Sequence, residues 1–125
     1  MSIFVLLVSL AIMISLDAIY LTLTKSFYNK QIRIIQGSDM KIKITPVLII
    51  YVILIFGLNR FILHDNKPVL DAVILGFIIY AVFELTNIAI FDNWNIESVL
   101  LDTTWGAILF GLTTYITYFI TRRIK

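Results

Sequence analysis

Residues 80–106 read YAVFELTNIAIFDNWNIESVLLDTTWG, and this stretch decides what kind of fold the chain can have. An apolar segment ends in a short polar turn at 92–95, and a second apolar segment follows it. Two carboxylates, Glu84 and Asp102, stand inside these apolar segments. A charged group at membrane depth costs about 3 kcal/mol or more, so such residues usually face a bundle interior or a cavity. The stretch therefore predicts a membrane hairpin with a polar inner face.

The composition of the whole chain points to the same class of protein. Of its 125 residues, 60% are hydrophobic and only 14% are charged. Soluble domains carry about a quarter charged residues, so this composition could not cover a water-exposed surface. The net charge is only +2 and the basic residues are scattered, which argues against a nucleic-acid partner. The absence of cysteine excludes disulfides, thiolate metal ligands and a cysteine nucleophile.

Four apolar segments are long enough, or nearly so, to cross a bilayer, which takes about 20 residues. They predict a single transmembrane domain over 1–125 with an all-α fold, an integral membrane four-helix bundle. Between the first two segments, five of the ten basic residues alternate with apolar ones. This pattern predicts a basic interfacial loop at the headgroups, with a solvated loop as the alternative. The expected spans are about 3–23, 46–62, 69–91 and 96–120, with the interfacial loop at 25–44.

The depth of the polar residues along these spans predicts that they meet in one layer. With four spans, the 25–44 loop and the 92–95 turn lie on the same side of the membrane. At about 1.5 Å per residue, Asp17 lies about 12 Å from Lys25, and Glu84 and Asp102 lie at comparable depths from their own turn. No Lys or Arg falls in this layer, so we expect at least one carboxyl group to be protonated. The candidate ligand-binding residues are Asp17, Tyr20, Tyr51, Tyr80, Glu84, Asn87, Asp102 and Trp105.

Several functions are compatible with such a layer. Our leading hypothesis is a small transport-like or ligand-binding protein with a site for a proton, a cation or a cationic small molecule, whose aromatic rings offer cation–π contacts. The alternative is an accessory or assembly subunit in which the polar groups only join helices. A lipid-modifying enzyme using paired carboxylates is a third reading. It is less favoured because no catalytic or cofactor motif accompanies the acids, and we expect no catalytic residue, metal or cofactor.

The motifs themselves resemble a known family. LDAIYL, SFYNKQI, YAVFELTN, NWN and LDTTWG occur in this order, and together they resemble the uncharacterised membrane-protein family called domain of unknown function 2177. The resemblance covers nearly the whole chain and implies a four-span, multi-pass integral membrane protein. It implies no established activity. This sequence departs from the expected pattern at Phe83 and Glu84, where tyrosine and aspartate are expected, and at Asn95, where proline is usual.

Partners and orientation are less well specified. The lipid bilayer is one partner, and the small size of the chain suggests a homodimer or a larger membrane complex around the site. Gly76, Gly106 and Gly111 provide faces on which helices can approach closely. The two membrane faces carry equal numbers of Lys and Arg, so charge does not decide the topology. The first helix alone, with basic residues only after it, favours the 25–44 loop in the cytoplasm.

Overall fold

The computed structural model describes residues 2–121, which form four long helices and no strand within that range. Each helix is long and apolar enough to cross a membrane. The all-α, four-helix prediction is therefore confirmed, and so is the multi-pass membrane character. The sequence ends its last apolar segment in a basic tail, which we expect at the headgroups, but Arg122, Arg123 and Lys125 lie outside the described residues. The elements are α1 (Ile3–Gln36), α2 (Ile44–Leu58) continuing into the π-helical turn η1 (Asn59–Leu63), α3 (Val69–Ile90) and α4 (Ile96–Thr121).

The first helix differs most from expectation. α1 does not end near residue 23 but continues to Gln36, which gives it a total length of 34 residues. Residues 25–36 are therefore helical, and only 37–43 are irregular. The reason is local: neither Gly nor Pro occurs between Ile3 and Gln36, and interspersed lysines do not stop a helix. Gly37 ends it in a left-handed conformation with φ 78°, and its N–H donates to the Arg33 carbonyl. A helix of this length is about 50 Å long, so its last turns extend beyond a hydrocarbon core of about 30 Å.

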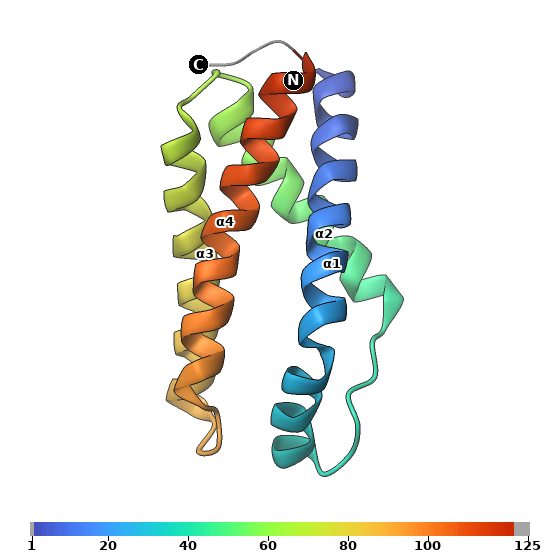
Figure 1. Cartoon of the computed structure of the whole chain (residues 1–125), viewed down its shortest axis with the longest axis vertical. Coiled ribbons are helices and arrows are strands. Elements are labelled where there is room, and N and C mark those ends of the chain that lie inside the picture. The colour runs from blue at the N-terminus through green and yellow to red at the C-terminus, as the bar shows by residue number, and fades with distance from the viewer. Residues whose placement is uncertain (1, 122–125) are drawn as a thin grey trace.

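The helices associate unequally (Figure 1). α3 and α4 form the closest pair, α1 packs on α4, and α2 with η1 contacts α1. α2 crosses obliquely behind the other helices in this view. The loop between α1 and α2 and the turn between α3 and α4 lie at the same end of the molecule, as four consecutive spans require.

Glycines make the close approach of α3 and α4 possible. A Cβ at Gly76 would lie 2.2 Å from the Gly106 carbonyl oxygen, and one at Gly106 would lie 2.2 Å from the Tyr80 ring. Gly111 similarly faces Val73, at 2.6 Å from its Cγ2. The three glycines that we expected to support helix approach, including approach between two copies, are therefore used inside the chain. They are not available for contact between copies.

The distribution of side chains is the reverse of that in a soluble protein. The exposed residues of α2 and α3 are nearly all large and apolar. In contrast, the residues buried inside the described bundle include polar ones, among them Ser9, Asp17, Gln31, Asn59 and Glu84. Lipid solvates apolar side chains but offers no hydrogen bonds, so polar groups are turned inward. This arrangement positions the polar layer between the helices.

The packing of Gly106 generates a prediction about stability. Gly106→Ala should lower the free energy of unfolding by about 1–3 kcal/mol relative to Gly57→Ala, because overpacking displaces the Tyr80 ring. Gly57 is the matched control, since nothing lies within 4 Å of a Cβ built there, and both changes share the same gain in helix propensity. Thermal unfolding in detergent, followed by circular dichroism, measures the difference. Equal stability of the two variants would contradict the packing described.

Candidate functional site

Three carboxyl groups from three different helices come together in the bundle. Asp17 lies on α1, Glu84 on α3 and Asp102 on α4. Asp17 is 8% exposed, Glu84 is 1% exposed, and Asp102 is half-buried. The Asp102 carboxyl group is close enough to both of the others to interact with them electrostatically. The structure thus brings the acidic residues of the predicted layer into one cluster.

Asp17 receives hydrogen bonds from two other helices. The Tyr51 hydroxyl on α2 donates to Asp17 Oδ2 at 2.5 Å, and the Trp105 indole Nε1 on α4 donates to Oδ1 at 2.9 Å. Both carboxylate oxygens therefore have a neutral donor. Through this one side chain, α1 is joined to α2 and to α4.

Glu84 accepts a hydrogen bond from Trp94, which is not among the predicted site residues. The Trp94 indole Nε1, in the turn between α3 and α4, donates to Glu84 Oε1 at 2.9 Å. The Trp94 ring stacks on Phe91 with centroids 6.0 Å apart. A tryptophan in a polar turn is typical of the interfacial aromatic belt. The position of Trp94 in the sequence does not show that its indole N–H points into the bundle.

Asp102 is approached by a pair of tyrosines. The Tyr20 hydroxyl donates to Asp102 Oδ1 at 3.4 Å, and it also forms a hydrogen bond with the Tyr28 hydroxyl. The Tyr20 ring stacks on Trp105 with centroids 4.6 Å apart and planes 3° from parallel. Tyr28 was missed because we expected the helix to end before it. Its place in the continuous α1 helix could have been inferred from the lack of a breaker before Gly37.

The remaining predicted site residues differ in their surroundings. Tyr80 packs against Gly106 and lies edge-on to Phe110 at 6.4 Å, with its hydroxyl near Asp17 and Asp102. Within residues 2–121 that hydroxyl forms no hydrogen bond. The half-buried Asn87 side chain also has no hydrogen-bond partner in this range, so the structure does not connect it to the network. The predicted residues that the hydrogen bonds do connect are Asp17, Tyr20, Tyr51, Glu84, Asp102 and Trp105.

Two neighbouring polar residues of η1, Asn59 and Arg60, have different surroundings. Asn59 is buried, and its Nδ2 donates to Ser9 Oγ at 3.0 Å and to the Ile55 carbonyl at 2.8 Å. Arg60 instead lies at the surface over the Phe61 ring, at 5.5 Å. Asn59 thus forms a second link between α1 and the α2–η1 helix, away from the acidic cluster.

Among residues 2–121, no basic side chain forms an ion pair with the three acids. Between residues 2 and 121, the only salt bridge joins Arg33 to Asp39 at 2.9 Å, and it lies at the surface. Across the same part of the chain, no three His, Cys, Asp or Glu side chains are arranged to hold a metal ion. In the described part of the chain, the hydrogen-bond donors to the acidic cluster are tyrosine hydroxyl and tryptophan indole groups.

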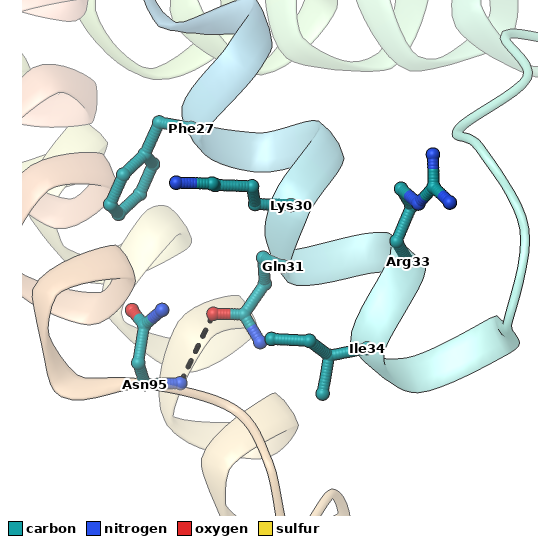
Figure 2. Close-up of a pocket in the computed structure, with 6 residues that line it drawn as sticks. All are labelled: Phe27, Lys30, Gln31, Arg33, Ile34 and Asn95. Carbon is teal, nitrogen blue, oxygen red and sulfur yellow. Dashed lines mark hydrogen bonds between the residues drawn. The ribbon is translucent and has the colours of Figure 1, made fainter.

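A buried glutamine lies between the extended end of α1 and the turn before α4. Gln31, only 1% exposed, donates from Nε2 to the Asn93 carbonyl at 2.8 Å. Its Oε1 accepts from the Asn95 backbone N–H at 3.2 Å (Figure 2). The same oxygen accepts from Ser98 Oγ at 3.2 Å. These bonds fasten the extended end of α1 to the turn that carries Trp94. A loop over 25–44, as the sequence predicts, would leave Gln31 without a fixed position, so this contact is not predictable from the sequence pattern.

Fold and cluster together define an integral, multi-pass membrane protein with a buried acidic and aromatic layer. The sequence profile of the family described as "Predicted membrane protein (DUF2177)" matches residues 2–119, and the chain belongs to this family. The resemblance found in the motifs is thereby confirmed. No curated protein and no solved structure matches the chain significantly.

The bond between Tyr51 and Asp17 should contribute measurably to stability. Tyr51→Phe removes the donor at Oδ2 and leaves a buried carboxylate oxygen unpaired, so we expect the free energy of unfolding to fall by about 1–3 kcal/mol. Tyr115→Phe is the control, because the Tyr115 ring is exposed on α4. Denaturant unfolding in detergent micelles measures both variants. If they unfold alike, the bond does not hold α2 in place.

Proposed function

We propose that this protein is a small transport-like or ligand-binding membrane protein whose buried acidic cluster takes up a proton or an organic cation. The observation that carries the proposal is the meeting of Asp17, Glu84 and Asp102 without a basic partner in the described range. A cluster of acids in a low-dielectric interior lowers its free energy by acquiring positive charge. A cation bound beside the three carboxyl groups supplies this positive charge.

The three carboxyl groups differ in the hydrogen bonds that they accept. Asp17 accepts two hydrogen bonds, one from Tyr51 and one from Trp105. Glu84 has the single Trp94 donor and lies beside Asp102, which has one long bond from Tyr20. Two adjacent carboxylates in an apolar environment repel each other, so the pair of Glu84 and Asp102 favours the binding of a positive charge beside it.

The aromatic residues of the cluster favour a proton or an organic cation over a chelated metal ion. Tyr20 and Trp105 present stacked rings beside Asp102, and the Tyr80 hydroxyl is uncommitted within the described residues while lying near two acids. Faces of Tyr and Trp attract cations at distances up to about 6 Å. The arrangement of acids described above does not form a metal-chelating group in residues 2–121.

A purely structural role is the competing explanation, because hydrogen bonds between polar side chains of membrane helices each stabilise the fold by about 0.6 kcal/mol on average. Glu84→Gln distinguishes the two, because the amide keeps the shape and can still accept from Trp94 but no longer titrates. In the purified protein, we expect wild type to release protons on binding tetraphenylphosphonium. We expect Glu84→Gln to fold but to lose most of that release.

The matched control is Glu97→Gln, the same chemical change at an exposed position in the first turn of α4. Proton release is followed with a pH dye in weakly buffered micelles, and infrared difference spectra report the carbonyl stretch of a protonated carboxylic acid. We expect that band to weaken in Glu84→Gln and in Asp102→Asn, and to persist in Glu97→Gln. The proposal would be refuted if Glu84→Gln released as many protons as wild type and its carbonyl band were unchanged.

A further inference from the structure

A groove at the extended end of α1 is separate from the acidic cluster. It has a volume of about 620 Å³ and is open to the surface. Figure 2 shows the side chains that line it, which come from the last turns of α1 and from the turn before α4. Lys30 lies thirteen positions after Asp17, which places it about 20 Å farther along the helix. The lining residues are Phe27, Lys30, Gln31, Arg33, Ile34 and Asn95.

The two basic residues of the groove differ in availability. Arg33 is paired with Asp39 at 2.9 Å, and in Figure 2 its side chain points away from Phe27 and Asn95. Lys30 is exposed, has no acidic partner among residues 2–121, and extends across the groove on the side of Phe27. The groove therefore presents one uncompensated ammonium group next to an aromatic ring.

Asn95 adds a neutral donor on the opposite wall. Its Oδ1 accepts from the Ser98 backbone N–H at 2.7 Å, in the manner of an N-cap, and this bond orients the side chain. The amide Nδ2 makes no hydrogen bond with any residue in 2–121, so it can donate to a ligand oxygen. An ammonium and an amide donor on facing walls suit an oxyanion such as a phosphate diester. Phe27 and Ile34 supply the apolar surface that a glycerol backbone and the first acyl carbons would contact.

We propose that this groove binds the headgroup of an anionic phospholipid from the adjacent leaflet. Lys30 and Asn95 contact the phosphate, and Phe27 and Ile34 contact the upper part of the acyl chains. The length of α1 supports this source of phosphate, because its final turns leave the hydrocarbon core and reach the headgroup level. A zwitterionic lipid fits less well, since its own cation would lie beside Lys30.

A lipid bound in this groove would be connected to the acidic cluster through Gln31 and the turn between α3 and α4. The groove floor includes Gln31, which is bonded to the turn between α3 and α4, and Trp94 of that turn donates to Glu84. A lipid that bridges Lys30 and Asn95 adds a further link between α1 and this turn. We therefore expect bound lipid to stabilise the folded bundle, whatever the acidic cluster binds.

The test uses the purified full chain in a non-ionic detergent, titrated separately with phosphatidylglycerol and phosphatidylcholine of identical acyl chains. Native mass spectrometry counts retained lipids, and thermal unfolding reports stabilisation. We expect phosphatidylglycerol to be retained and to raise the melting temperature, with phosphatidylcholine much weaker on both measures. Lys30→Gln should weaken phosphatidylglycerol binding about fivefold, the effect of one basic residue at an anionic membrane surface.

Lys25→Gln is the matched control, because it removes the same charge from the same helix outside the groove. We expect it to bind phosphatidylglycerol nearly as wild type does, and Lys30→Arg to retain most of the affinity. Phe27→Ala should reduce retention without altering the preference for the anionic headgroup. Equal weakening by Lys30→Gln and Lys25→Gln, or equal binding of both lipids by wild type, would overturn the proposal.

Discussion

A carboxyl group buried in a lipid-embedded bundle depends on hydrogen-bond donors from its own chain, because the surrounding hydrocarbon offers none. This constraint accounts for much of the arrangement described here. Asp17 takes one donor from α2 and one from α4, and thereby joins the obliquely crossing α2 to the rest of the molecule. α2 with η1 packs mainly on α1. Its polar attachments include the bond from Tyr51 to Asp17, the bond between Asn59 and Ser9, and the bond from the Tyr118 hydroxyl of α4 to the Ile62 carbonyl.

The register of α3 against α4 follows from the short turn between them. Glu84 and Asp102 lie at equal sequence distances on either side of Asn93, and so do Tyr80 and Gly106. In an antiparallel pair, residues equally far from the turn face each other. The glycines then allow the two backbones to come close enough for the Tyr80 ring to rest on Gly106 and for the two acids to interact. The acidic pair and the glycine packing are therefore consequences of one helical hairpin.

The extended end of α1 gives this hairpin a second support. Gln31 satisfies two backbone groups of the turn and the Ser98 hydroxyl, while Tyr28 bonds to Tyr20 within the cluster. Had the helix ended at residue 23, neither side chain would be held at a defined position. Basic residues on the same turns line the surface groove, so one continuous helix serves both the buried cluster and the membrane surface.

The sequence by itself determined the membrane class, the four helices, the family and the acidic residues on the inner faces. These follow from composition, the length of apolar runs and helical periodicity, which act locally and can be counted along the chain. Tertiary structure alone decided that Trp94 points at Glu84, that Asn87 remains outside the hydrogen-bond network, and that the glycines are used within the chain. The direction of a side chain depends on which helix packs against it, and residues far apart in sequence set that packing. The length of α1 lies between these cases: the absence of Gly and Pro before residue 37 permitted the continuation, and the contact of Gln31 with the distant turn holds it in place.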